Sequence, residues 1–320
     1  MNLEYGTVSV KGKSHIDTNL PNQDFIDTYA IDDTIILIAA DGAGSAPLSD
    51  QGSRRIITKV LDNLKNIKDK KLLTDPFKHE VLLQKIIIDS INELRNNLSE
   101  GKKEEFDIIK KKEIDLKNLF LKPLTKIVPF FSKSRPEQKE IIVEIKNENI
   151  DVSGEIIKET DAAKDKESVD LADPKLSDYA STFLLIITSP LSTFTAHIGD
   201  GYIFGCNRKS DLKNQFVSLP RNGEYDNQTY FFTDDNWSQN IRFESRKEAF
   251  DFCLILTDGA DRFWVGPDRK SLHTPLLDNF LKIRDKHSDK DLTTILQNVF
   301  TYEKIITVST DDATIGMVIR

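Results

Sequence analysis

The chain has 320 residues, of which 38% are hydrophobic and 30% are charged, and its formal net charge is −8. These values are typical of a globular protein with a sizeable core, and they argue against broad electrostatic attraction to nucleic acid or to an anionic membrane. Two cysteines are too few for a disulfide scaffold, the sequence opens without a basic-then-apolar signal, and no apolar run reaches membrane-spanning length, so we expect a cytoplasmic protein.

The first part of the chain has the pattern of β-strands. Residues 5–10, 25–31 and 34–40 are short runs rich in β-branched and aromatic residues, separated by polar or Gly/Pro breaks. Because only Asp32 and Asp33 link the second run to the third, we expect these two strands to form an antiparallel hairpin.

Two amphipathic helices are predicted next, over residues 48–64 and 79–98. In both segments apolar residues recur at the spacing that places them on one face of a helix. Two antiparallel helices of this kind can cover one face of a sheet.

The composition changes over residues 101–175, which are dense in Lys, Glu and Asp and contain few aromatic residues. Residues 114–131 and 141–145 carry enough apolar side chains for a local helix or strand, and the remainder has the composition of a solvated insertion. Two interpretations remain open, a tolerated surface insertion and a module that contacts a partner or regulates the protein.

Regular elements resume after the insertion. Strands are predicted at residues 181–188, 193–198, 202–207, 241–244, 250–257 and 314–319, and helices at residues 276–284 and 292–303. Groups of strands followed by pairs of helices, twice along the chain, predict an α+β fold. The expected architecture is an α-β-β-α sandwich of two mainly antiparallel sheets flanked by helices.

Several aspartates lie where apolar runs begin or end. Asp24 opens one run, Asp41 and Asp258 close two others, and Asp311 precedes the last. Carboxylates gathered at one rim of a sheet repel one another unless cations neutralise them. Because hard divalent metals prefer oxygen ligands, a metal site is the simplest physical reason to bring these side chains together.

Six short motifs occur in a characteristic order: Asn22-Gln23-Asp24, Asp41-Gly42, Ala180-Ser181-Thr182, Gly199-Asp200, Thr257-Asp258-Gly259 and Asp311-Asp312-Ala313-Thr314. In this order the chain resembles the metal-dependent protein phosphatase 2C family, in a bacterial branch, over its whole length apart from the charged insertion. Each dipeptide alone is a common turn former, so the signal comes from the ordered set.

The resemblance implies one catalytic domain over residues 1–320, interrupted by residues 101–175, with two Mn²⁺ or Mg²⁺ ions between the sheets. Asp41 would contact both ions, Gly42 would bind one through its carbonyl, and Asp258 and Asp311 would complete the ligands of the first ion. Asp24 would hold metal-bound waters. The implied activity is that of a serine/threonine protein phosphatase, in which a metal-activated water hydrolyses a phosphoester of a phosphorylated protein.

The segment before the first acidic motif departs from the family pattern. Many relatives have an arginine there that holds substrate phosphate, whereas this chain has Ser14-His15-Ile16-Asp17-Thr18-Asn19. Lys13 or His15 can substitute for it, and His15 can also donate a proton to the leaving group. A hydrogen-bonded surface role for His15 is the alternative.

Three further positions bear on the site. Gln23 stands where a glutamate is usual, and Ala43 stands where some eukaryotic relatives have a histidine proposed as general acid. Asp178 lies near the place where relatives bind a third, weaker ion, although a helix-cap or strand-cap role is the competing interpretation.

Two other functions are compatible with the residues. One is a catalytically weak pseudophosphatase that binds a phosphorylated partner, which the missing arginine and Gln23 favour and the intact Asp41, Asp258 and Asp311 disfavour. The other is a small-molecule phosphohydrolase that uses the same metal site.

Overall fold

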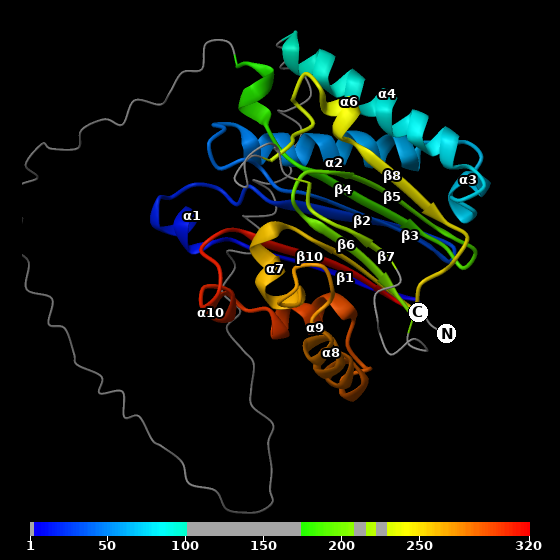
Figure 1. Ribbon diagram of the computed structural model, residues 1–320, viewed down its shortest axis with the longest axis vertical. Helices are drawn as coiled ribbons and strands as arrows, with labels where there is room; N and C mark the ends of the chain where they lie inside the picture. The colour runs from blue at the N-terminus through cyan, green and yellow to red at the C-terminus, as the bar shows by residue number, and fades with distance from the viewer. Residues whose placement is uncertain (1–2, 101–173, 208–215, 222–228) are drawn as a thin grey trace, which may run out of the picture. The chain divides into compact units, whose positions relative to one another are not determined.

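The computed structural model describes residues 3–100, 174–207, 216–221 and 229–320. Within them, ten strands form two antiparallel five-stranded sheets that stand face to face (Figure 1). The first sheet, in spatial order, consists of β1 (Glu4–Val10), β10 (Ala313–Ile319), β9 (Phe252–Leu256), β6 (Tyr202–Cys206) and β7 (Phe216–Ser218). The second consists of β2 (Phe25–Ile31), β3 (Thr34–Ala40), β4 (Phe183–Thr188), β5 (Thr193–Ile198) and β8 (Arg242–Arg246).

The predicted hairpin is β2–β3, in which Ile31 lies opposite Thr34. Asp32 closes its turn with φ 49°, a left-handed conformation that aspartate tolerates better than most residues. Every residue of β3 and β4 is buried, because one face of each strand packs on the other sheet and the opposite face packs on helices. This accounts for their continuous apolar sequences, in which hydrophobic and polar residues do not alternate.

A tightly packed apolar layer separates the two sheets. Leu37 and Leu184 from the second sheet meet Ile203 and Ile255 from the first in one buried cluster. Gly316 of β10 is needed at this interface, because a Cβ there would lie 2.7 Å from both the Ile255 and the Ile26 side chains. The sheets therefore approach closely over the centre of the fold.

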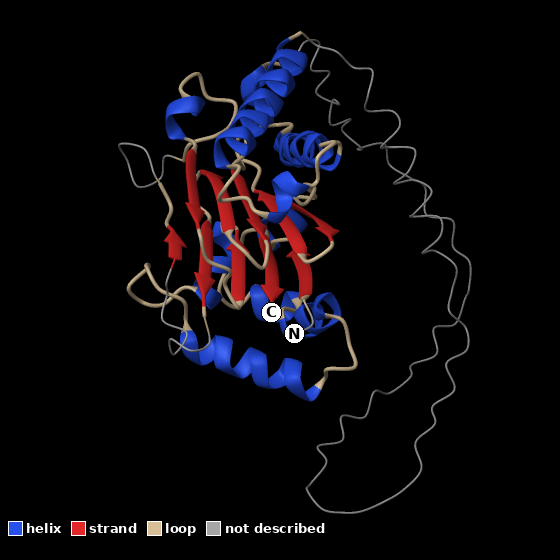
Figure 2. Ribbon diagram, turned by 90° about the vertical axis from the view of Figure 1, so that its right-hand side faces the viewer, coloured by secondary structure: helices blue, strands red, loops and turns tan. Residues whose placement is uncertain are grey.

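Helices cover the outer face of each sheet (Figure 2). The second sheet is covered by α2 (Ser49–Lys65) and α4 (Glu80–Ser99), and the first by α7 (Asp258–Trp264), α8 (Thr274–Lys286) and α9 (Leu292–Val299). Short helical segments are α1 (Lys13–Asp17), α3 (Lys71–Thr74), η1 (Leu176–Tyr179), α6 (Trp237–Asn240) and α10 (Tyr302–Ile305). The predicted α-β-β-α sandwich is confirmed.

Some elements differ from the sequence prediction. The predicted helix over residues 292–303 is two helices, since the chain is extended at Thr301 with ψ 156° between α9 and α10. Asp258 begins α7, whereas the sequence predicted only that it ends a strand. The short elements α1 and β7 were not predicted, because five and three residues are too few to show a periodicity.

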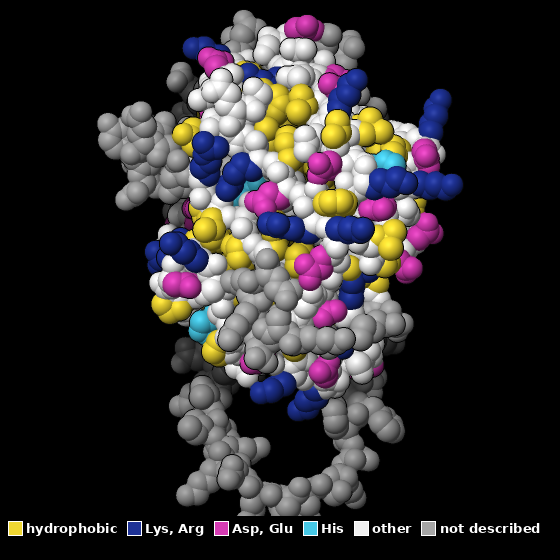
Figure 3. Space-filling view, turned by 45° about the vertical axis from the view of Figure 1, so that its right-hand side comes forward, with side chains coloured by type: hydrophobic (Ala, Val, Ile, Leu, Met, Phe, Trp, Pro, Cys, Tyr) yellow, Lys and Arg dark blue, Asp and Glu magenta, His cyan; other side chains and the backbone are white. Residues whose placement is uncertain are grey.

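Most of the predicted insertion, residues 101–173, lies outside the described residues. No helix in the described ranges is long and apolar enough to cross a membrane. Figure 3 shows Lys and Arg side chains interspersed with Asp and Glu over one face, so neighbouring charges of opposite sign offset one another there.

Candidate metal centre

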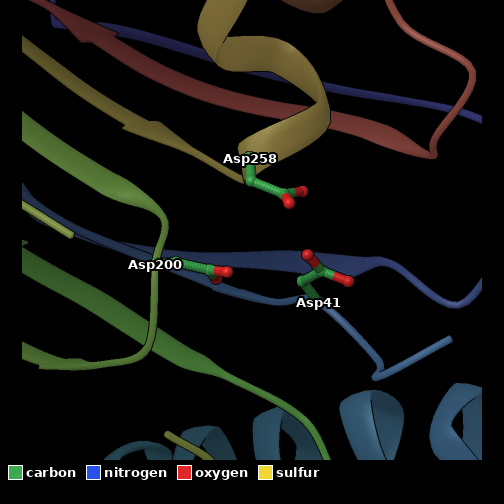
Figure 4. A group of neighbouring side chains, drawn as sticks. All are labelled: Asp41, Asp200 and Asp258. Carbon is green, nitrogen blue, oxygen red and sulfur yellow. The ribbon is translucent and has the colours of Figure 1, made fainter. Parts of the chain in front are cut away.

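Three aspartates from distant parts of the chain converge at one end of the sheets. Asp41 follows β3, Asp200 lies in the turn between β5 and β6, and Asp258 begins α7. One carboxylate oxygen of each lies within 4.8 Å of those of the other two. Figure 4 shows the three side chains pointing into a common space.

Backbone hydrogen bonds fix Asp41 at the junction of two strands. Its N–H donates to the Thr182 hydroxyl at 2.9 Å, and its carbonyl accepts from the Thr182 N–H at 2.8 Å. The next residue, Gly42, pairs with Ser181 in an isolated β-bridge. A Cβ on Gly42 would lie 2.7 Å from the Ser49 carbonyl oxygen and 2.9 Å from that of Gln23, so only glycine fits here.

The turns that carry the other two aspartates are equally constrained. Gly199 has φ 108°, which favours glycine, and it places Asp200 where the Thr229 hydroxyl donates to one carboxylate oxygen. Asp258 follows Thr257, whose hydroxyl accepts from the Thr314 N–H at 3.0 Å and ties the start of α7 to β10. Backbone geometry and the neighbouring hydroxyl groups thus hold both carboxylates in place.

The carboxylates raise one another's pKa. Burial is the largest cause of the raised pKa of Asp258, about 7, and the negative charges of Asp200 and Asp311 add to it. Burial first, then the charges of Asp24 and Asp258, also holds the pKa of Asp41 well above its ordinary value. Burial raises the pKa of Asp200 in the same direction. The cluster is therefore unfavourable as a set of bare anions.

Unpartnered oxygens give an independent test of whether a cation fits. Asp258 Oδ1 and Asp200 Oδ1 are buried and accept no hydrogen bond within the described part of the chain. A buried acceptor without a donor is costly, and a divalent cation would satisfy it. The donor set is entirely oxygen, so it fits Mn²⁺ or Mg²⁺ rather than a metal that prefers sulfur.

Asp24 and Asp311 lie around this group of three. Asp24 is buried and accepts from the Thr257 hydroxyl at 2.7 Å through Oδ2, while its Oδ1 has no hydrogen-bond partner among the described residues. Asp311 is exposed and does not belong to the group, although its charge raises the pKa of Asp41, Asp200 and Asp258. Asp24 and Asp311 thus both lie within electrostatic range of the three-aspartate cluster.

His15 is held by a buried carboxylate. Its Nδ1 lies 2.8 Å from Asp312 Oδ2, and Asp312 also accepts from the backbone N–H groups of Gly12 and Gln23, both at 2.6 Å. Nδ1 is thus the nitrogen engaged by Asp312, while Nε2 makes no hydrogen bond within the described residues. Asp312 in turn donates its N–H to Asp311 Oδ1 at 2.9 Å.

Asp178 lies apart from the cluster and acts in local structure. Its carboxylate accepts from the Lys175 N–H at 2.8 Å and caps η1, and its carbonyl accepts from the Leu48 N–H at 2.9 Å. The third member of the cluster is Asp200, to which the sequence analysis assigned no role. The sequence did contain a signal for Asp200. Like Asp41, which follows β3 and precedes Gly42, Asp200 comes after an apolar strand and directly precedes a glycine, Gly201.

Comparison with known proteins agrees with this geometry. The family model for Protein phosphatase 2C matches residues 11–297, and the chain belongs to this family. Serine/threonine-protein phosphatase 3 of Escherichia coli K12 is 34% identical over 106 residues, which are 32% of this chain and 40% of that protein. The match therefore spans less than half the length of this curated relative.

Solved structures share the fold at low sequence identity. The S. agalactiae serine/threonine phosphatase aligns with a TM-score of 0.53 and 11% identity over 99% of both chains. A C. elegans sex-determining protein aligns with a TM-score of 0.52 and 9% identity over 100% of this chain and 65% of its own. At such identities the likeness establishes the two-sheet fold alone.

Proposed function

We propose that this chain is a Mn²⁺- or Mg²⁺-dependent serine/threonine protein phosphatase that hydrolyses phosphoesters of phosphorylated proteins. The observation that carries the proposal is the convergence of Asp41, Asp200 and Asp258, which repel one another and leave buried oxygens unpartnered. Family membership supports the same activity. Asp41, Asp258, Asp311 and the Gly42 carbonyl would hold two ions, and Asp200 adds a ligand beside them.

When bound, the ions supply a water of lowered pKa and positive charge that stabilises the phosphoryl oxygens. The protein's own residues orient the reactants. The free Oδ1 of buried Asp24 can accept a hydrogen bond from a water at the edge of the cluster and fix its direction. Neither buried cysteine is a candidate nucleophile, because burial raises the pKa of both Cys206 and Cys253 to about 12.

His15 is proposed as the proton donor to the leaving group. As the ester P–O bond breaks, the departing oxygen takes a proton from Nε2, the ring nitrogen that Asp312 leaves free. Asp312 keeps Nδ1 engaged and so fixes the orientation of the ring. His15 would then act as the general acid. Some eukaryotic relatives have a histidine proposed for this role directly after the position of Gly42, where this chain has Ala43.

Two wider parts of the proposal concern the whole chain. Residues 1–320 form one catalytic domain, and residues 101–175 are a charged insertion that contacts a partner or substrate protein. A cytoplasmic location fits Cys206 and Cys253, which are both buried free thiols.

The direct test is phosphate release from a phosphothreonine peptide in the presence of Mn²⁺. We expect turnover that EDTA stops and that Asp41→Asn lowers by about 100-fold or more, as expected when a metal-dependent charge-stabilising site is lost. Asp278→Asn, an exposed carboxylate on α8, is the control and should retain full activity. Binding of the peptide without turnover would support a pseudophosphatase, and higher kcat/KM for small phosphate monoesters would support a small-molecule phosphohydrolase.

A further inference from the structure

Arg269 has an unusual backbone conformation for its residue type. Among the described residues, three non-glycine positions have positive φ, namely Asn19 (56°), Asp32 (49°) and Arg269 (57°). Asparagine and aspartate tolerate this region because their short polar side chains bond locally, whereas arginine has no such advantage. A strained position of this kind persists only where the surrounding structure holds it, and it raises the question of function.

The turn around Arg269 is closed by several hydrogen bonds. Gly266 N–H donates to the Ser271 carbonyl at 2.6 Å, and Arg269 N–H donates to the Gly266 carbonyl at 2.9 Å. The Asp268 carboxylate accepts from the backbone N–H groups of Lys270 and Ser271, both at 3.0 Å. The backbone of Arg269 is therefore fixed before any ligand arrives.

The guanidinium of Arg269 is anchored beside the metal centre. Its Nη2 lies 2.6 Å from Asp261 Oδ2, and Asp261 is three residues after Asp258 on α7. The same group lies over the ring of Tyr202 at 5.8 Å, and Tyr202 comes two residues after Asp200.

The two partners of this ion pair differ in exposure. The Asp261 side chain is 7% exposed, whereas that of Arg269 is 58% exposed. Asp261 thus holds one edge of the guanidinium, while more than half of the Arg269 side chain is exposed. A planar fork that is anchored on one side and open on the other is suited to binding an oxyanion.

We propose that Arg269 binds an oxyanion of the substrate at the Asp200 side of the metal centre. The proposal rests on the phosphatase function proposed above. It gives this chain an arginine contact to the substrate, which the segment Ser14-His15-Ile16-Asp17-Thr18-Asn19 lacks. The oxyanion is either an oxygen of the reacting phosphoryl group or an acidic side chain next to the phosphorylated residue, and the experiment separates these sources.

The test compares Arg269→Gly and Arg269→Lys with a matched control. Glycine accepts the positive φ, so Arg269→Gly removes the guanidinium without straining the turn. Arg269→Lys keeps a positive charge for Asp261 but loses the fork, so it remains informative where the glycine variant is unstable. Arg246→Ala is the control, because Arg246 also pairs with a carboxylate, Glu244 at 3.2 Å, and also lies over an aromatic ring, Phe216 at 5.6 Å.

Arg246 is far from Asp200 along the sheet. It pairs with Thr193, the first residue of β5, whereas Asp200 lies two residues beyond Ile198, the last residue of that strand. The control therefore removes the same kinds of contact at the opposite end of the strand. Thermal unfolding of all variants reports any loss of stability separately from loss of binding.

The Mn²⁺-loaded full chain is assayed for KM and kcat with p-nitrophenyl phosphate and with phosphothreonine peptides that carry or lack an acidic neighbour. The Kd of inorganic phosphate is measured in parallel by calorimetry. For Arg269→Gly we expect KM to rise about 10-fold with kcat within about twofold of wild type, as for loss of one charged hydrogen bond. The KM of Arg269→Lys should lie between those of wild type and Arg269→Gly, and the KM of Arg246→Ala should match that of wild type.

A rise in KM for p-nitrophenyl phosphate and in the Kd of phosphate assigns Arg269 to the phosphoryl group. A rise confined to the acidic peptide assigns it to a neighbouring carboxylate. Wild-type KM and Kd values in both Arg269 variants, with only a lower Tm, would overturn the inference. If the wild type does not turn over any ester, the proposed function fails, and the phosphate Kd of wild type against Arg269→Gly still decides the role of Arg269.

Discussion

Replacing Asp258 with asparagine is expected to stabilise the metal-free protein, although it removes a ligand from the metal centre. Burial and the charges of Asp200 and Asp311 raise the pKa of Asp258 from 3.8 to about 7. Since one pKa unit corresponds to about 1.4 kcal/mol, holding this carboxylate ionised at pH 8 costs the fold about 4 kcal/mol relative to the unfolded chain. The neighbouring carboxylates share the repulsion, so the expected gain for Asp258→Asn is about 2–4 kcal/mol.

The pH dependence gives this prediction a definite sign. Between pH 3.8 and about 7 the folded chain retains a proton on Asp258 that the unfolded chain releases, so wild type loses stability as the pH rises through this window. The advantage of Asp258→Asn should therefore be less than half as large at pH 5 as at pH 8. For a chain of this size, the gain at pH 8 corresponds to a Tm increase of about 3–8 °C.

The assay is thermal and urea unfolding in EDTA at pH 5 and pH 8, followed by the same measurement with Mn²⁺. Mn²⁺ at about 100 times its Kd should stabilise wild type by about 2.7 kcal/mol and the variant by less. The stability advantage of Asp258→Asn over wild type should therefore shrink or change sign when Mn²⁺ is present. The exposed carboxylate variant Asp278→Asn should behave as wild type throughout. An Asp258→Asn protein that is no more stable than wild type in EDTA at pH 8 would refute the repulsion argument.

Three further perturbations have expected outcomes. His15→Ala should lower turnover of a phosphothreonine peptide by about 100-fold and remove the alkaline limb of its pH–rate profile, with a much smaller effect on p-nitrophenyl phosphate, whose leaving group needs no proton; an unchanged profile would assign His15 a structural role. Replacing residues 103–172 with a short Gly/Ser linker should leave a folded protein that hydrolyses the small ester, and an insoluble or inactive product would show that this segment belongs to the core. Burial and the charge of Arg242 hold the pKa of His197 well below its ordinary value, so below about pH 6.5 the unfolded chain binds a proton that the folded chain does not. Urea unfolding at pH 7 and pH 5 should therefore show that wild type loses up to about 2 kcal/mol more than His197→Gln, and equal losses would contradict this.

The sequence was sufficient to predict most of the fold. The apolar runs of β3 and β4 and the helical spacing in α2 and α4 are strong local signals, and the structure confirms the two-sheet architecture that they predicted. Short elements were missed for a physical reason. The strand β7 exists through its pairing with β6, and the single turn of α1 is held in place by a bond from the Ser14 N–H to the Thr310 carbonyl at 3.0 Å. Local sequence pattern carries no information on such contacts.

The candidate site was predictable in part. Asp41, Asp258 and Asp24 could be selected because each lies at the end of an apolar run, a property visible in the sequence. Asp200 also follows an apolar run, but its membership of the cluster depends on how β5, β3 and α7 converge, which the sequence pattern alone does not show. Arg269 could not be selected from the sequence, because its proposed role follows from an ion pair with Asp261 and a ring contact with Tyr202.

The most direct test of the metal centre is anomalous diffraction from crystals of the full chain grown with Mn²⁺. Strong anomalous peaks are expected within about 2.0–2.6 Å of carboxylate oxygens of Asp41 and Asp258, with Asp200 close beside them, as for divalent ions bound by oxygen. The same experiment on Asp41→Asn should show these peaks weakened or lost. Peaks that lie elsewhere, or a saturated crystal in which Asp41 contacts no Mn²⁺, would contradict the assignment of this cluster as the metal centre.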